Sequence, residues 1–305
     1  MRRLGAVALA AALAGCAAEP GRAGDPDPAA GTAVSTSSTT APAGPVLPLP
    51  GHRPVAAGDP SGLTTQLATA LDVLAWPGRP IEEVVSAGHL QQVALAALAA
   101  RPEWDAAVAE RLPPAHRLAV ATDVGAVREL QALVRRPRPT LPAWRVRRPP
   151  PAEDLRAWYA EAEAVTGVPW SLLAAVHLVE TRMSRIDGTS TAGAQGPMQF
   201  LPSTWAVYGE GGDIRDNRDA ILGAARFLAV SGARDDPYRA LLRYNPTPPY
   251  ARAVAAFAGR MAADERAFAG YHGWEVHYRT TLGDVWLRPG YAATEERPVT
   301  ADDLR

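Results

Sequence analysis

Apolar side chains recur at helical spacing over two long parts of the chain. In the first part, residues 61–135, they return every three or four positions, as at Leu63 and Leu67, which predicts amphipathic helices. Prolines interrupt the pattern at Pro77, Pro102 and Pro113. Since proline ends helices, we expect four short helices here. The segment is small and poor in aromatic residues, so we expect it to pack against the rest of the chain.

The same spacing returns in the second part, where it places a carboxyl group on an apolar helix face. We expect one helix over residues 152–166 and another from Pro169 to Met183. Glu180 follows Val176 by one turn, so it shares the face that should be buried. Burial raises a carboxyl pKa, and the group then serves as a general acid near neutral pH. An ion pair of Glu180 with Arg182 or Arg185, or exposure of this face, is the alternative.

Irregular composition separates these parts from each other and from the N-terminus. Residues 17–60 are rich in Pro, Gly, Ala, Ser and Thr and predict a disordered tether. Residues 136–151 alternate Pro with Arg and predict an extended connector. We expect this connector to be a solvated linker; contact with anionic wall polymer or phospholipid headgroups is the alternative. Near the C-terminus, Trp274 to Leu287 predicts a short β-hairpin. The expected fold class is therefore mainly α.

Residues 1–16 have the layout of a bacterial export signal. Two arginines precede a short apolar run, and Gly15-Cys16 closes it. Leu13 to Cys16 resembles the lipobox of bacterial lipoproteins, which implies cleavage before Cys16 and lipidation of its thiol. An ordinary signal with an incidental cysteine is the alternative. The predicted location is the extracytoplasmic cell envelope, with the protein anchored to the membrane by lipid.

Composition and charge exclude several classes of protein. The net charge is -1, which argues against a nucleic-acid partner. All 31 basic residues are arginine, so no catalytic lysine of any kind is present. Cys16 is the single cysteine of the chain, which excludes an intramolecular disulfide and a cysteine zinc site. The lone His89 and His116 are expected at the surface or at helix caps.

Three segments in the second half carry a family resemblance. Glu180-Thr181 is followed by the glycine-containing loop Gly196-Pro-Met-Gln199, which continues into Pro202-Ser-Thr-Trp205, and later by Tyr244-Asn245. In this order they resemble the catalytic domain of soluble lytic transglycosylases, a lysozyme-like family that cleaves peptidoglycan. The residues of these segments most resemble those of the membrane-bound B-type lytic transglycosylases and their actinobacterial relatives. The resemblance covers roughly residues 150 to 260.

The resemblance implies a fold, a reaction and a set of site residues. It implies a lysozyme-like helical catalytic domain over residues 152–261, preceded by the helical segment 61–135 and followed by an extension, residues 262–305, that holds the hairpin. Glu180 is implied to be the single catalytic acid and base, acting on peptidoglycan glycan strands with a 1,6-anhydro product and without metal or organic cofactor. The substrate-binding residues it implies are Ser190, Gln199, Tyr244 and Asn245. We expect the Tyr244 hydroxyl within hydrogen-bond reach of Glu180.

Other interpretations of these residues remain open. A non-catalytic peptidoglycan-binding lipoprotein would keep the cleft for docking, and a hydrolytic muramidase would add water instead of forming an anhydro ring. The acidic run from Asp213 to Asp219 is interpreted as helix capping rather than a calcium loop, since it lacks EF-hand spacing. His177 precedes Thr181 by one helical turn and is expected in the core or at the rim rather than lining the cleft.

Overall fold

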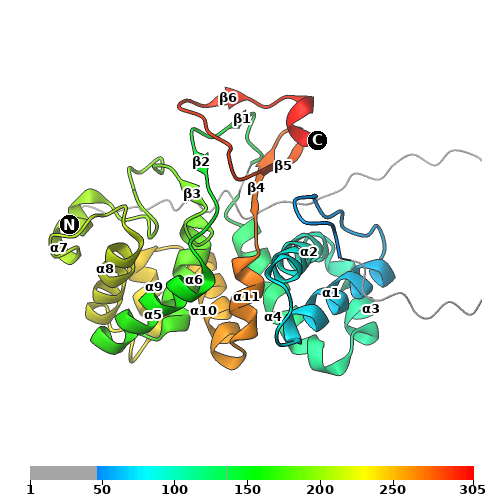
Figure 1. Ribbon diagram of the computed structural model, residues 1–305, viewed down its shortest axis with the longest axis horizontal. Helices are drawn as coiled ribbons and strands as arrows, with labels where there is room; N and C mark the ends of the chain where they lie inside the picture. The colour runs from blue at the N-terminus through cyan, green and yellow to red at the C-terminus, as the bar shows by residue number, and fades with distance from the viewer. Residues whose placement is uncertain (1–46, 135) are drawn as a thin grey trace, which may run out of the picture.

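The computed structural model describes residues 47–134 and 136–305 and is mainly helical, as predicted (Figure 1). The signal segment, Cys16 and most of the expected tether lie outside this range. Along the described chain the helices are α1 (Pro60–Ala75), α2 (Ile81–Ala99), α3 (Asp105–Arg111), α4 (Pro114–Gln131), α5 (Ala152–Thr166), α6 (Trp170–Thr181), α7 (Pro202–Tyr208), α8 (Asn217–Val230), α9 (Pro237–Tyr244), α10 (Pro248–Ala263) and α11 (Arg266–His272). Within residues 47–134 and 136–305, no helix combines the length and the apolar character that crossing a membrane requires.

Short antiparallel strand pairs form a small lobe above the helices (Figure 1). The predicted hairpin is confirmed as β4 (Val276–Thr280) and β5 (Gly283–Leu287). The other pairs are β1 (Thr140–Leu141) with β6 (Arg297–Pro298) and β2 (Arg145–Val146) with β3 (Ile186–Asp187). One side of this lobe closes over a separate hydrophobic cluster made of Leu141, Trp144, Val146, Ile186, Val276, Tyr278, Val285 and Leu287.

The expectation of a solvated linker over residues 136–151 is wrong. The segment is extended, but Leu141, Trp144 and Val146 are buried and pair or pack with strands from far along the chain. Alternating residues of a strand point to opposite faces, so Val146 enters the cluster while Arg145 and Arg147 face solvent. The prolines prevent a helix here without preventing strand pairing at an edge.

The helices before residue 135 share one core with the later helices, as expected from their size. One large hydrophobic cluster contains residues from both groups, from Leu63 in α1 to Trp274 after α11. Helix α4 packs on α10, and α2 packs on α11. Figure 1 shows α10 and α11 between the early helices and the group α5 to α9. Neither group therefore buries its apolar face alone.

The predicted surface position of His89 is wrong. The side chain is buried, and its Nε2 lies 2.9 Å from Nε2 of His277 on β4, so one ring donates to the other. Burial lowers the pKa of His89 to about 3, which keeps the ring neutral. His116, by contrast, pairs with the exposed Asp72 at 2.7 Å. A sequence does not reveal a histidine partner 188 positions away.

Candidate active site

Glu180 occupies the last turn of α6 and is buried from solvent. Its side chain is 3% exposed, and its Oε1 accepts a hydrogen bond of 2.6 Å from the hydroxyl of Tyr250. Its Oε2 is buried without a hydrogen-bond partner in the described part of the chain. The alternative ion pair with an arginine is wrong, because Arg185 pairs with Glu275 and the Arg182 guanidinium lies over the Trp274 ring.

This environment favours the neutral acid. Burial raises the pKa of Glu180 to about 8, and the hydrogen bond from Tyr250 opposes that rise. The carboxyl group is therefore mostly protonated at neutral pH. Because Tyr250 donates to Oε1, the proton belongs on Oε2, the oxygen without a partner. The site therefore holds a proton on an oxygen that no described residue engages.

The raised pKa also has a cost in stability that Glu180→Gln should remove. The folded protein binds the proton more tightly than the unfolded chain, so this group costs stability as pH rises from the unfolded pKa of 4.5 through about 8. The free energy of unfolding of Glu180→Gln minus that of wild type should therefore be larger at pH 9 than at pH 6, by on the order of 2 kcal/mol. Urea unfolding at both pH values measures this gain, and an equal difference at both would contradict it.

The three sequence segments meet through consecutive backbone carbonyls of one loop. The Thr181 hydroxyl donates to the Pro197 carbonyl at 2.6 Å, and the Tyr244 hydroxyl donates to the Met198 carbonyl at 2.5 Å. The Gln199 side chain donates to the Gly196 carbonyl at 3.0 Å. The loop is thus fastened to the ends of α6 and α9.

The expected hydrogen bond between Tyr244 and Glu180 is wrong. The Tyr244 hydroxyl is engaged with the Met198 carbonyl, and its ring packs on Phe227 and Phe200. The phenol that reaches Glu180 belongs to Tyr250, in the first turn of α10. Sequence reasoning does not single out Tyr250, because it lies outside the three segments that carry the resemblance. The helix that begins at Pro248 has a buried face, and Tyr250 is its first aromatic member.

The chain leaves α6 through a strained turn. Arg182, Met183 and Ser184 have φ of 57°, 54° and 69°, in the left-handed region that L-residues seldom adopt in succession. The Met183 amide donates to the His177 carbonyl, and the Ser184 amide donates to the Thr181 hydroxyl oxygen at 3.2 Å. These bonds hold the turn that follows Glu180 directly.

His177 stabilises the same turn from within the core, in agreement with its expected core position. The ring is fully buried, with Nδ1 2.7 Å from the Tyr159 hydroxyl and Nε2 2.7 Å from the Ser184 hydroxyl, which in turn donates to the Asn217 side chain. Burial lowers the pKa of His177 to about 3. With Tyr159 donating to Nδ1, the neutral ring donates to Ser184, so this imidazole is a structural donor and not a base for the serine.

The remaining predicted site residues have different environments. The Ser190 hydroxyl oxygen accepts from the amides of Ala192 and Ala194, so it shapes its own loop. Gln199 and Asn245 are buried, and the side-chain oxygen of each has no hydrogen-bond partner in the described chain. Unsatisfied buried acceptors carry a desolvation cost, which a ligand donor would relieve. The substrate-binding roles of these residues remain predictions.

Gly196 is required by the loop that follows α6. A Cβ atom there would lie 1.8 Å from the Ile214 carbonyl oxygen, and its φ of +74° favours glycine. On the same side of the loop, the Arg215 guanidinium donates to the Gln195 side chain at 3.2 Å. The glycine therefore lets the segment around Ile214 press directly on the loop near Glu180.

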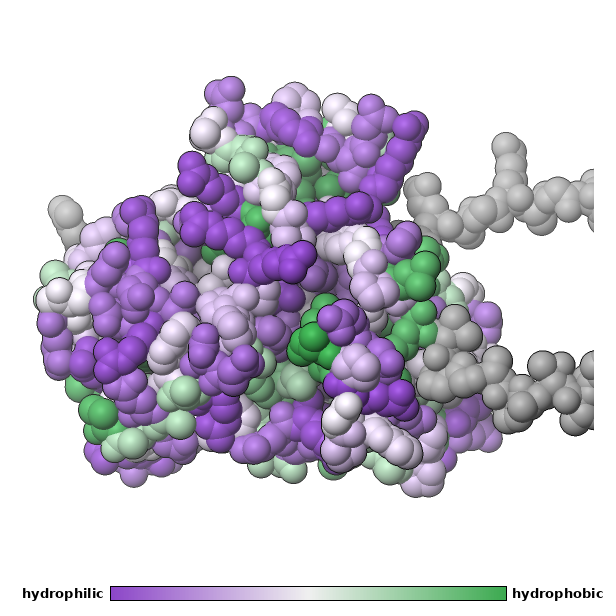
Figure 2. All heavy atoms as spheres, viewed as in Figure 1, coloured by the Kyte–Doolittle hydropathy of each residue, from purple (hydrophilic) through white to green (hydrophobic). Residues whose placement is uncertain are grey.

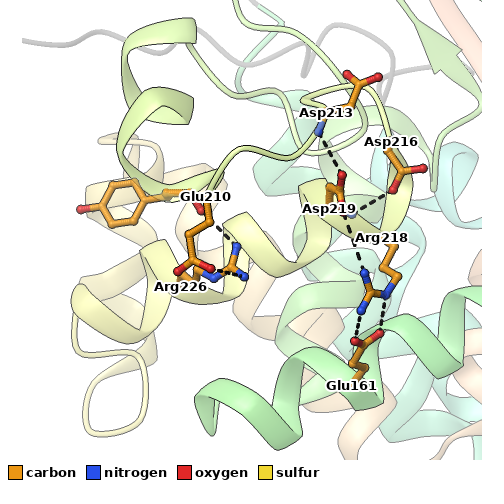
Figure 3. Close-up of polar contacts among 8 residues, drawn as sticks. Glu161, Glu210, Asp213, Asp216, Arg218, Asp219 and Arg226 are labelled. Carbon is orange, nitrogen blue, oxygen red and sulfur yellow. Dashed lines mark hydrogen bonds and ion pairs between the residues drawn. The ribbon is translucent and has the colours of Figure 1, made fainter.

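The acidic segment that supplies this contact is held by helix capping, as interpreted from sequence (Figure 3). The Asp216 carboxylate accepts from the Asp219 amide at 3.0 Å at the start of α8. The Asp219 carboxylate accepts from the Asp213 amide at 2.9 Å, and Arg218 pairs with Glu161 of α5. These acids bond to backbone amides and stabilise the segment that contacts Gly196.

A cavity of about 390 Å³ opens beside this arrangement. Its walls come from the turn after α6, the loop near Gly196 and the end of the connector, through Ser184, Ile186, Gly188, Pro197, Arg147 and Arg148 among others. Glu180 does not line the cavity, but its neighbour Thr181 bonds both to the Pro197 carbonyl and to the Ser184 amide. Thr181 thus links the end of α6 that carries Glu180 to the cavity wall.

Comparison with known proteins gives one partial similarity. A segment of 84 residues is 38% identical to membrane-bound lytic murein transglycosylase F of Thiobacillus denitrificans. The aligned segment covers 28% of this chain and 17% of that protein. The chain therefore aligns with well under two thirds of that relative. No protein-family model and no solved structure matches the chain. Part of this chain is similar to part of a lytic murein transglycosylase.

Proposed function

We propose that this protein is a peptidoglycan lytic transglycosylase that cleaves the β-1,4 bond between N-acetylmuramic acid and N-acetylglucosamine through Glu180. The observation that carries the proposal is the buried Glu180 carboxyl, bonded by Tyr250, where three segments that resemble this family meet; burial raises its pKa to about 8. The partial similarity to a lytic murein transglycosylase supports the same reaction class.

The first step is protonation of the leaving group. Because Oε2 is buried and Glu180 does not line the cavity, the site must open at Glu180 when glycan binds. Glu180 then transfers the proton from Oε2 to the glycosidic oxygen, which leaves with the N-acetylglucosamine residue. The acetamido oxygen of the muramoyl sugar stabilises the developing positive charge at C1, as in the substrate-assisted exception to the two-carboxylate mechanism. Tyr250, which donates to Oε1, stabilises the glutamate anion that this transfer leaves.

The second step closes the ring. Ionised Glu180 takes the proton of the muramoyl C6 hydroxyl, and that oxygen attacks C1 to form the 1,6-anhydro sugar. The proton returns to the carboxyl group, so no water is consumed. A single carboxylate suits this cycle, whereas ordinary glycosidases need a pair about 5 to 9.5 Å apart. The acid Asp187, on the strand that follows, is instead paired with Arg147 at 2.6 Å.

Mass spectrometry of products from purified wall should detect muropeptides with 1,6-anhydro ends. Each such end lies 18 mass units below its reducing counterpart, because no water has been added. Reducing ends would show a hydrolytic muramidase, and intact glycan that still binds the protein would show a non-catalytic binder. Either result contradicts the proposed reaction.

The proposal includes a location in the cell envelope. The lipobox at Leu13 to Cys16 favours a lipid anchor at the Cys16 thiol, with the tether between anchor and helices. The roughly 30 residues from Ala17 to Val46 would span an r.m.s. distance on the order of 30 Å if flexible. That reach suits a polymeric substrate that lies away from the membrane surface.

A further inference from the structure

Arginines gather on the face of the small lobe beside the candidate active site. Arg147, Arg148 and Arg215 line the cavity next to Ser184 and Pro197. A second cavity of about 490 Å³ shares Arg147, Asp187 and Arg215 with the first, and Arg145 also lines it. The two cavities form one groove, called the arginine groove below. Figure 2 shows hydrophilic residues over the region of β2 and β3, where this groove lies.

The charge of the arginine groove is strongly unbalanced. Four arginines and a single acid, Asp187, line it, which leaves a net charge of +3. Asp187 pairs with Arg147, and Arg215 donates to Gln195. The Arg145 and Arg148 side chains are exposed and form no hydrogen bond or ion pair within residues 47–134 and 136–305. Their charges are available to a ligand.

Strand geometry explains why two of the arginines, Arg145 and Arg147, face the same way. Arg145 lies opposite Asp187 in the β2–β3 pair, and Arg147 follows two positions later on the same face. The intervening Val146 and its partner Ile186 point into the hydrophobic cluster. Because the neighbouring positions are fixed in the core, the basic face is held in place rather than carried by a mobile tail.

We propose that the arginine groove binds the carboxylates of the peptide stems attached to the glycan strand, which rests on the proposed transglycosylase function. Guanidinium groups recognise carboxylates through paired, charge-assisted hydrogen bonds. The stem leaves from the same muramoyl sugar whose anomeric bond is cut. Thr181, next to Glu180 in sequence, bonds to two residues of the cavity wall, so the groove adjoins the segment that carries the proposed acid.

The proposal predicts a preference for glycan that carries its stems. Full-length protein should be assayed on stem-bearing strands and on strands stripped of stems by an amidase. Arg148→Glu should lower kcat/KM on stem-bearing strands at least fivefold, mainly through KM, and change it less than twofold on stripped strands. Arg239→Glu, an exposed arginine on α9, is the charge-matched control and should alter neither.

Binding gives a second measurement that does not depend on cleavage. Cosedimentation with intact and stem-stripped sacculi should show that Arg148→Glu weakens binding to the intact material only. An equal loss on both substrates, or no loss on either, overturns the stem-binding proposal. A further outcome separates the two proposals. If wild type prefers stem-bearing sacculi, Arg148→Glu removes that preference, and wild type cleaves no glycan, then stem binding is supported and the transglycosylase function is contradicted.

Discussion

Glu180→Gln is expected to lower glycan cleavage by at least about 100-fold, the usual contribution of a general acid and base. The amide keeps the shape of the side chain and still accepts the hydrogen bond from Tyr250, but it neither gives nor takes the proton. Release of soluble muropeptides from purified sacculi, quantified by chromatography, measures the effect.

The control is Glu153→Gln, which neutralises an exposed carboxylate on α5 and should leave cleavage unchanged. Binding of Glu180→Gln to sacculi should equal that of wild type, which separates lost chemistry from lost affinity. Residual cleavage above about 1% of wild type would refute a single-acid mechanism at this residue.

Tyr250→Phe is expected to reduce turnover about tenfold or more and to move the pH profile. In the wild type, kcat/KM should fall as pH rises through about 8, because the first step needs protonated Glu180. The bond from Tyr250 lowers that pKa, so its removal shifts the falling limb to higher pH. Loss of a donor to the anion slows turnover at every pH. Rates measured from pH 5 to 10 report both effects.

Tyr244→Phe is the matched control for this experiment. It also deletes one buried phenol oxygen, but the bond lost is to the Met198 carbonyl. We expect a loss of about 1 kcal/mol in the free energy of unfolding and a falling limb at the wild-type pH. A shifted limb in Tyr244→Phe and none in Tyr250→Phe would reverse the assignment of the two tyrosines.

The helices and the position of the acid were predictable because both depend on local periodicity. Val176 and Glu180 lie one turn apart, and the structure buries both. The strand that buries Val146 was not predictable in the same way, since its partner Ile186 follows 40 positions later and two residues are too short for a pattern. The proline and arginine content predicts a linker, but pairing with the distant strand β3 makes this segment part of the fold.

The errors at the site have a common physical origin. Tyr244 and Tyr250 are six residues apart, and the chain between them leaves α9 and enters α10. Which phenol faces the carboxyl depends on the packing of α10 against α6, which no local pattern contains. The resemblance pointed to Tyr244 because it belongs to a recognisable pair with Asn245. It carried no information about the hydroxyl's direction.

The contacts of α2 with the residues around the start of β4 have a consequence for folding during synthesis. Gln92 donates to the Glu275 carbonyl at 2.9 Å and accepts from its amide at 2.7 Å, across 183 positions, close to the pair of His89 and His277. A ribosome delivers α2 long before these partners exist. The early helices therefore make these contacts only after Glu275 and His277 have emerged, and such distant contacts slow folding. A protein truncated after α10 should be retained by chaperones or degraded, even though every residue of the candidate active site would still be present.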